Sequence, residues 1–258
     1  MKNGFLSVII KNGAAVDSRA QQLLWDFLCA LMRNGQILRG YNLVRGKNYC
    51  AYVTMPEESS LDEGNDNKYV SLYRAEVSKI FNLSVHMLGV NASSMEYCSC
   101  KIRGDLEMQT LSGDIDSVFV CMNCGKPVPL YKLPHLYDDA ENANVNMWQD
   151  SYSAMDTLWL ESLVDRYTGR QLTLPDSVLN SSGRDIAAEM GKALGCRVYY
   201  NMYDDLGWYT KKPKWAEEDG QMVRICPSCG KLMHHYAVGD YERELCDDCM
   251  LSSEPYEG

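Results

Sequence analysis

The sequence predicts an α+β protein with an N-terminal domain (1–95), a central α/β region (96–204), a linker (205–222) and a C-terminal cysteine-rich ribbon (223–258). Three observations support this division. The hydrophobic period of the N-terminal domain switches repeatedly between that of a strand and that of a helix. Eight of the 11 cysteines gather in two closely spaced clusters. The stretch before the last cluster is rich in charged residues, Gly and Pro, which is typical of a linker.

The N-terminal domain is predicted to alternate strands and helices. Asp17-Ser18 forms a helix cap and Asn34-Gly35 a helix end, with apolar residues at helical spacing between them. The predicted segments are strand 5–10, helix 18–34, strand 37–44, strand 49–55, an acidic loop over 56–67, helix 70–81 and strand 83–90. The order β-α-β-β-α-β predicts a ferredoxin-like domain, in which two helices cover one face of a four-stranded antiparallel sheet.

The central region is predicted to be mainly helical after its cysteines. Apolar and aromatic residues repeat at helical spacing within 139–167, and we expect this stripe to pack in the core rather than to hold a ligand. A second helix is expected within 175–195, followed by a strand over 196–203. The stripe consists of Trp148, Tyr152, Met155, Leu158, Trp159 and Leu163.

The C-terminal cluster consists of two CxxC pairs, Cys226 with Cys229 and Cys246 with Cys249, separated by sixteen residues. This spacing is typical of four-thiolate zinc sites. Each CxxC turn lets two sulfurs face one ion, and two turns complete a tetrahedron at about 2.3 Å. Gly230 can adopt the positive φ that folds the backbone over the ion. We predict a structural zinc site, because four thiolates leave no position for water or substrate.

The earlier cluster consists of Cys98, Cys100, Cys121 and Cys124. Its second half repeats the CxxCGK sequence of the C-terminal ribbon, whereas its first half is a CxC pair with only one intervening residue. We expect a second zinc ion here, bound by all four thiolates. In the alternative, one residue of the CxC pair is an ordinary buried thiol and His135, the nearest spare imidazole, completes the site.

The other cysteines, Cys29, Cys50 and Cys196, are expected to be packing thiols. His234 and His235 lie between the two C-terminal CxxC pairs, where four cysteines already suffice. An odd number of cysteines with CxxC spacing is typical of metal binding in a reducing compartment. The N-terminus does not read as a secretory signal, and no segment has the roughly 18 apolar residues of a membrane helix. We therefore expect a cytoplasmic protein that does not contact a membrane.

The charge of the chain bears on its partners. With 25 Lys and Arg against 35 Asp and Glu, the net charge is −10, which counts against a protein that coats nucleic acid. Both cysteine clusters are acidic, at −3 from Cys226 to Cys249 and −2 from Cys98 to Cys124, so neither offers a basic surface to phosphates. Basic residues interleaved with aromatic residues, which can stack on single strands, occur in 208–215 and 39–49. A solvated linker and an exposed sheet face are the simpler interpretations of these two segments.

Several motifs resemble those of a known family. They are the run from Cys121 through Val128-Pro129-Leu130-Tyr131 to Pro134, the segment 148–156, Gly183-Arg184, the segment 199–203 and the CPxCG ribbon. Together they resemble an uncharacterised bacterial family described as zinc-ribbon-containing and proposed to bind nucleic acid. Some similar proteins resemble immunity proteins that accompany secreted polymorphic toxins. The resemblance is best over about 110–250, and it implies zinc cysteines but no catalytic residue.

No catalytic signature is present, since the chain has no P-loop, GxGxxG, GxSxG or HExxH motif. We therefore expect a non-enzymatic protein that acts by protein–protein interaction. The favoured function is that of an immunity protein, or antitoxin, that occludes the active site of a cognate bacterial toxin. Acidic charge suits this role, because complementary charge speeds the capture of a basic toxin. The alternative is a nucleic-acid-binding regulator that uses the ribbons and the 208–215 segment.

Overall fold

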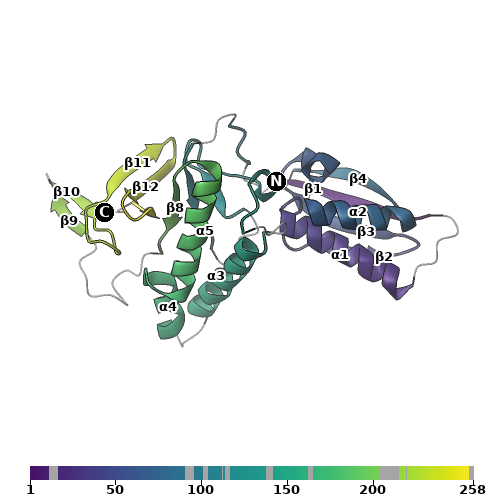
Figure 1. The fold of residues 1–258 in the computed structure, drawn as a ribbon, viewed down its shortest axis with the longest axis horizontal. Coiled ribbons are helices and arrows are strands. Elements are labelled where there is room, and N and C mark those ends of the chain that lie inside the picture. The colour runs from purple at the N-terminus through teal and green to yellow at the C-terminus, as the bar shows by residue number, and fades with distance from the viewer. Residues whose placement is uncertain are drawn as a thin grey trace. The chain divides into compact units, whose positions relative to one another are not determined.

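The structure is a computed structural model that describes residues 1–11, 17–90, 96–100, 104–111, 113, 117–137, 142–161, 165–203, 215–218 and 220–255. It contains several sheets and helices, so the predicted α+β class is confirmed (Figure 1). The chain forms two compact units. Unit 1 comprises Met1–Tyr97, Ile115–Ser117 and Pro127–Ala143, and unit 2 comprises Cys98–Asp114, Val118–Lys126 and Asn144–Gly258.

Unit 1 is a four-stranded sheet with two helices on one of its faces. Its elements in chain order are β1 (Lys2–Ile10), α1 (Ser18–Asn34), β2 (Asn42–Arg45), β3 (Tyr49–Met55), α2 (Lys68–Ile80) and β4 (Phe81–Val90). The strands lie in the order β2-β3-β1-β4, and each adjacent pair is antiparallel. α1 and α2 lie side by side (Figure 1). The element order is therefore β-α-β-β-α-β, as the hydrophobic periods predict.

The core of unit 1 lies between the sheet and the helices. Leu6 and Val8 of β1 and Ala51 and Val53 of β3 alternate with less buried neighbours, so every second residue points toward α1 and α2. The predicted cap is present, since the Asp17 carboxylate accepts a hydrogen bond of 2.9 Å from the backbone N–H of Ala20. The helix therefore begins where the sequence indicates.

The strand predicted over 37–44 begins later, at Asn42. The backbone N–H groups of Gln36 and Ile37 donate to the carbonyl oxygen of Leu31, at 3.0 and 3.4 Å, and hold this segment against the end of α1. Ile37 is buried in the core of unit 1. Its apolar side chain is explained by this packing and not by a strand.

The segment after the first cysteine cluster packs in unit 1. It contains a short 3₁₀ turn, η3 (Leu130–Lys132). Gly35, which ends α1 with a φ of 79°, lies so close to Leu130 that an added Cβ would be 2.6 Å from the Leu130 Cβ. The Tyr131 hydroxyl donates to Glu57 at 3.0 Å. Glu57 precedes two further 3₁₀ turns in the predicted loop, η1 (Glu58–Leu61) and η2 (Glu63–Asn65).

Unit 2 contains three helices, α3 (Ala143–Glu161), α4 (Asp165–Thr173) and α5 (Val178–Leu194). The predicted aromatic stripe is only partly in the core. Trp148 and Tyr152 are buried, but Leu158 is 52% exposed. The buried face of the second half of α3 carries Asp156 instead. The prediction of a continuous core stripe is therefore wrong for Leu158, because an apolar period gives spacing but not which turns of a helix have a neighbour. Leu163 lies outside the described residues.

The strands of unit 2 are short and come from distant parts of the chain. They are β5 (Leu106–Met108), β6 (Phe119–Cys121), β7 (Lys126–Pro127), β8 (Val198–Asn201), β11 (His234–Val238), β12 (Tyr241–Cys246) and β13 (Leu251–Ser253). They form one sheet in the order β11-β12-β13-β8-β5-β6-β7. β9 (Trp215–Glu218) and β10 (Gln221–Arg224) form a separate hairpin. The C-terminal ribbon thus shares a sheet with the central region, through the parallel pair of β13 and β8.

The compact units differ from the predicted boundaries in two places. Residues 127–143 pack with the N-terminal elements, and the ribbon packs with the central region rather than apart from it. Of the predicted linker, 205–214 and 219 lie outside the described residues, and most of the rest forms the β9–β10 hairpin. Within the described residues, no helix is long and apolar enough to cross a membrane.

Candidate metal centres

The first cysteine cluster converges on one point in unit 2. Cys98 and Cys100 lie in a segment without regular secondary structure before β5, Cys121 is the last residue of β6, and Cys124 lies in the turn that follows. The four sulfur atoms lie within 4.8 Å of one another. Both cysteines of the CxC pair therefore take part in the group, and no histidine is needed to complete it.

Backbone geometry explains the glycine that follows this CxxC turn. The N–H groups of Cys124 and Gly125 donate to the carbonyl oxygen of Cys121 at 3.2 and 2.8 Å. Gly125 has a φ of 64°, which side chains disfavour. An added Cβ would also lie 2.8 Å from the Cβ of Tyr241. Both the turn and the packing of the ribbon against it require glycine at this position.

The thiols of this cluster differ in their readiness to ionise. Burial raises the pKa of Cys121 to about 12. Burial also opposes ionisation of Cys98, but hydrogen bonds from the Cys100 backbone N–H and from the neighbouring thiols lower its pKa on balance. The surroundings therefore favour the thiolate of Cys98 and oppose that of Cys121. A bound cation would supply the positive charge that four adjacent thiolates need.

The C-terminal cluster converges in the same way. Cys226 and Cys229 lie in the turn after β10, Cys246 is the last residue of β12, and Cys249 lies in the next turn. Their sulfur atoms also lie within 4.8 Å of one another. Two strand ends and two turns thus bring together residues that are up to 23 positions apart.

The turn at Cys226 has the form that the sequence predicts. Gly230, with a φ of 76°, donates its backbone N–H to the Cys226 carbonyl oxygen at 2.9 Å. The backbone N–H of Lys231 lowers the pKa of Cys229 to about 7. Amides directed at a sulfur favour its thiolate form, which is the form that binds metal.

Each cluster could hold one metal ion. Four cysteines in a closed group are the donor set of structural zinc sites, and soft thiolate ligands also suit iron. Among the described residues, the eight cysteines form two such groups of four. A tetrahedral ion bound by four sulfurs has no free position, so the arrangement can cross-link the chain but cannot activate a substrate.

The CxxC turn at Cys121–Cys124 packs against the end of β12, which leads into the CxxC turn at Cys246–Cys249, through a small core. Met122, inside the first turn, contacts Tyr199 of β8 and Leu245 of β12, and all three are buried. The Tyr236 hydroxyl of β11 donates to the Met122 carbonyl oxygen at 3.1 Å. The sheet is therefore curved, so that its β11–β12 end contacts the turn that follows β6. The two metal groups belong to one packed assembly.

A charged bridge runs beside this core. Arg197 donates to the Asp105 carboxylate at 2.8 Å, and its guanidinium lies 3.2 Å from Asp247, which sits between Cys246 and Cys249. Asp105 in turn accepts the Met122 backbone N–H on its carbonyl oxygen at 3.0 Å. The Arg197 side chain is half exposed, so the bridge orients the two turns but adds little stability.

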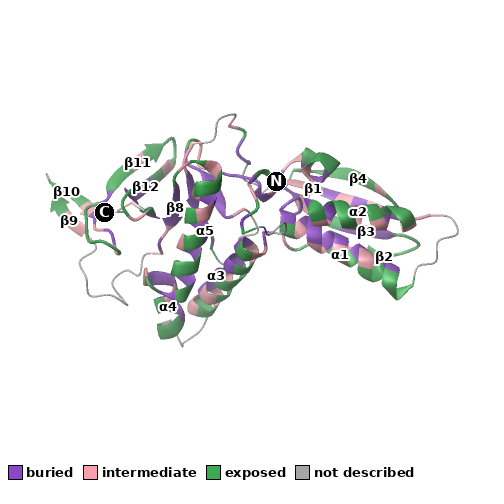
Figure 2. Ribbon diagram, viewed as in Figure 1, coloured by how far each residue is buried: buried purple, intermediate pink, exposed green. Residues whose placement is uncertain are grey.

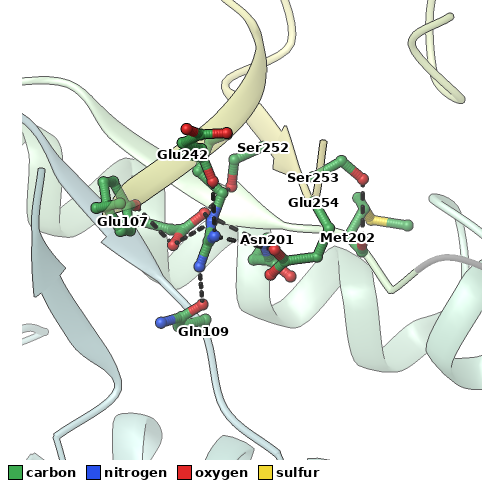
Figure 3. A network of polar contacts seen from close by, with 10 residues as sticks. Glu107, Gln109, Asn201, Met202, Glu242, Ser252, Ser253 and Glu254 are labelled. Atoms are coloured by element: carbon green, nitrogen blue, oxygen red, sulfur yellow. Dashed lines mark hydrogen bonds and ion pairs between the residues drawn. The ribbon is translucent and has the colours of Figure 1, made fainter. Parts of the chain in front are cut away.

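A buried ion pair links strands β5 and β12 of the sheet (Figure 3). Glu107 of β5 is completely buried, and Arg243 of β12 donates to both of its carboxylate oxygens at 2.8 and 3.0 Å. Tyr241, Ser252 and Asn201 also donate to this carboxylate, at 2.8, 2.5 and 3.1 Å. The remaining Arg243 partners are Gln109, Glu254 and the Glu242 carbonyl oxygen.

Sequence reasoning missed this ion pair. Glu107 and Arg243 lie 136 positions apart, and neither belongs to a motif. The one available signal is a carboxylate at the centre of an apolar strand, Leu106–Met108, which predicts a buried partner of opposite charge. Both carboxylate oxygens of Glu107 accept hydrogen bonds. The network therefore has a structural role and offers no acid or base to a substrate.

The other candidates from the sequence have structural surroundings. His135 lies 3.3 Å from Asn34 within unit 1. The Cys29 sulfur lies 3.3 Å from the Tyr41 hydroxyl, and Cys50 and Cys196 are partly buried. His234 and His235 are exposed on β11. Of the basic and aromatic segment 208–215, only Trp215 lies within the described residues, where the Arg224 guanidinium stacks on its ring at 5.1 Å.

Comparison with known proteins identifies a family domain but no function. The model of a family described as a domain of unknown function (DUF2310) matches residues 105–203, which is less than half of the chain. None of the curated proteins matches it. Among solved structures, the chain is similar to Rv0793 from Mycobacterium tuberculosis, at 16% identity over 36% of this chain and 100% of that chain, with a TM-score of 0.27. Similarity this low does not define the fold.

Proposed function

We propose that this protein is a non-catalytic binding protein, cross-linked by two zinc ions, that captures a protein partner with a basic surface. In its most specific form, the proposal is that the chain is an immunity protein that occludes the active site of a cognate toxin. The observation that carries the proposal is the acidic surface of the C-terminal ribbon. The metal groups support it indirectly, because closed four-cysteine sites stabilise a scaffold and leave nothing to catalyse.

The surface of the described residues 215–255 is slightly more acidic than a count of their charges indicates, because two arginines but only one glutamate, Glu244, are buried. Arg224 and Arg243 are buried, and Arg243 is engaged by Glu107. Among the described residues from 215 to 255, Lys231 is the one exposed Lys or Arg, and it is paired with Asp248 at 2.5 Å. The exposed carboxylates are Glu217, Glu218, Asp240, Glu242, Asp247, Asp248 and Glu254. Such a surface attracts a basic protein and repels phosphates.

Zinc is proposed as the metal because of the donor set. All eight ligands are cysteines, two residues apart in three pairs and one residue apart in the fourth. Elemental analysis of the purified chain is expected to find about two zinc ions. Cys98→Ser is expected to leave one ion, and Cys50→Ser, at a half-buried cysteine outside both groups, to leave two. Iron in place of zinc, or one ion in the unaltered chain, would contradict this assignment.

The binding role is tested with the products of neighbouring genes. The full chain is expected to rescue cells that express a toxic neighbour and to bind its product one-to-one. Asp240→Asn with Glu242→Gln removes two exposed ribbon carboxylates and is expected to slow association several-fold at low salt. The matched control, Asp62→Asn with Glu63→Gln, removes two exposed carboxylates from unit 1 and is expected to leave the rate unchanged.

The alternative function makes a different prediction in the same experiments. A nucleic-acid-binding regulator would bind RNA or DNA with an affinity that falls steeply with salt. It would be weakened by neutralising cations and strengthened by removing ribbon carboxylates. Failure to rescue any toxic neighbour, together with such binding, would replace the immunity proposal by this alternative.

The arrangement of unit 1 is also part of the proposal. We infer a ferredoxin-like domain from the element order β-α-β-β-α-β and the antiparallel sheet order β2-β3-β1-β4, with both helices on one face. A domain of this kind leaves the second face of its sheet open to a partner.

A further inference from the structure

We propose that the open face of the unit 1 sheet is a self-association surface, and that the partner it takes is a second copy of this chain. The open face is the side of the sheet away from α1 and α2. The strand registers place the following residues on it: Asn3, Phe5, Ser7, Ile9, Asn42, Val44, Cys50, Tyr52, Thr54, Asn82, Ser84 and His86. This inference does not depend on the proposed partner of the ribbon.

The open face is apolar and aromatic at its centre. Phe5 of β1 stacks on His86 of β4, with ring centroids 4.7 Å apart, and lies 6.2 Å from the ring of Tyr52 on β3. A row of three rings thus crosses three adjacent strands. Val44 and Tyr52 are 51% and 48% exposed. Exposed aromatic and β-branched side chains gathered on one face indicate an interaction site.

The open face also lacks charge. None of its described residues is Lys, Arg, Asp or Glu, although the chain carries 60 such residues in 258. The centres of protein–protein interfaces are depleted in charged residues in the same way. A nucleic acid would need cations on this face for its phosphates, and a basic protein would need carboxylates. An uncharged face suits a partner that is itself uncharged.

A second copy of the chain supplies such a partner. Two copies with a net charge of −10 each repel through most of their surface, but that charge is uneven. Unit 1 contains 11 Lys and Arg against 13 Asp and Glu, a net charge of −2, whereas unit 2 contains 14 against 22, a net charge of −8. Contact through the open faces of unit 1 brings together two surfaces without Lys, Arg, Asp or Glu.

Strand β4 extends the same surface to the edge of the sheet. It is the last strand in the order β2-β3-β1-β4. Its second half is exposed (Figure 2), with Val85, Met87, Leu88 and Val90 at 43%, 42%, 58% and 63%. The register places Val85, Met87 and Val90 on the side of the sheet that α1 and α2 cover, not on the open face. A long apolar edge strand is a liability in a monomer, because its unpaired backbone groups invite association.

The area is sufficient for a dimer. Four strands about 4.8 Å apart, with about eight residues of about 3.3 Å each, give the face roughly 500 Å² in plan. Two faces in contact bury about 1,000 Å², which reaches the size at which specific interfaces begin. A two-fold axis near Phe5 would pack the aromatic row of one copy against that of the other, as closed symmetry requires.

The first test measures the mass of the full chain by sedimentation equilibrium. We expect a dimer at micromolar concentration. Tyr52→Glu and Val44→Glu each place a carboxylate on the open face and are expected to raise the dissociation constant at least about 30-fold. Leu72→Glu is the matched control, since Leu72 is 55% exposed on α2, and it is expected to leave the dimer intact. A monomeric unaltered chain, or dimers that persist in both open-face variants, would overturn the proposal.

A second measurement uses the unaltered chain and needs no variant to fold. Cys50 lies on the open face and Cys29 on α1, and both are partly buried in unit 1. Alkylation of Cys50, mapped by mass spectrometry, is expected to slow at least about fivefold as the chain concentration rises through the dimer range, while that of Cys29 stays constant. Equal rates at all concentrations would overturn the proposal. So would single-stranded RNA that binds a monomer and protects Cys50, which would make the aromatic row a base-stacking surface.

Discussion

Unit 1 and unit 2 are stabilised in different ways. In unit 1, β1, β3 and β4 are nine, seven and ten residues long, and the inward faces of β1 and β3 bury a continuous apolar layer against two helices, together with Phe81 at the start of β4. In unit 2, the strands of the main sheet have between two and six residues. Such short strands place few apolar residues in a core. Unit 2 adds two four-cysteine groups and a buried ion pair, which join segments far apart in the sequence.

The difference predicts which changes reduce the stability of each unit most. The stability of an apolar layer is spread over many side chains, so single substitutions reduce it gradually. Cross-links and buried charges concentrate stability in a few groups, so the loss of one group has a large effect. The predictions below test this contrast.

Removal of metal is expected to have the largest effect. A chelator should unfold unit 2 and leave unit 1 folded, because structural zinc contributes on the order of 10 kcal/mol to folding in small four-ligand sites. Amide hydrogen exchange resolves the two units in one sample. The contrast would fail if unit 2 amides stayed protected after elemental analysis showed that the metal was gone, or if the unit 1 core lost protection together with them.

Glu107→Gln is expected to cost about 3–5 kcal/mol in the free energy of unfolding of unit 2. The substitution keeps the shape of the side chain but leaves the Arg243 charge buried without its counter-ion. Urea denaturation followed by hydrogen exchange measures the loss. Glu242→Gln, at an exposed position on the same strand as Arg243, is the control and should cost less than about 0.5 kcal/mol. Equal effects of the two substitutions on the free energy of unfolding would show that the ion pair contributes little to the stability of unit 2.

Leu28→Ala is expected to cost about 2–5 kcal/mol in unit 1, since Leu28 is fully buried between α1 and the sheet. Unit 2 should be unaffected, and the chain should still carry two metal ions. Hydrogen exchange of both units, with elemental analysis, checks this. Loss of metal in this variant would mean that the two units do not stabilise themselves separately.

Asp247→Asn is expected to have the smallest effect, at most about 1 kcal/mol, because its contact with Arg197 is half exposed to solvent. The effect should shrink further at high salt, where exposed charges are screened. Thermal unfolding at low and high salt measures it. A loss of several kcal/mol would indicate that the bridge between the two CxxC turns, rather than their packing around Met122, holds the metal groups together.

The sequence determined those features that depend on near neighbours. The cap at Asp17, the end of α1 at Gly35 and the CxxC turns at Cys121 and Cys226 all follow from residues within a few positions of one another. The alternation of strands and helices in unit 1 is also readable, since a period of two or of 3.6 residues shows which face of an element is buried. Spacing alone was enough to divide eight cysteines into two groups of four.

Tertiary structure decided what depends on residues far apart. It brought both cysteines of the CxC pair to the first metal group, left Leu158 exposed, packed Ile37 without a strand and joined Glu107 to Arg243 across 136 positions. It also buried two arginines and one glutamate of the ribbon region, which left its surface slightly more acidic than a count of charges predicts. The physical reason is the same in each case. The energy of a side chain depends on its neighbours in the folded protein, and these neighbours cannot be read from its position in the sequence.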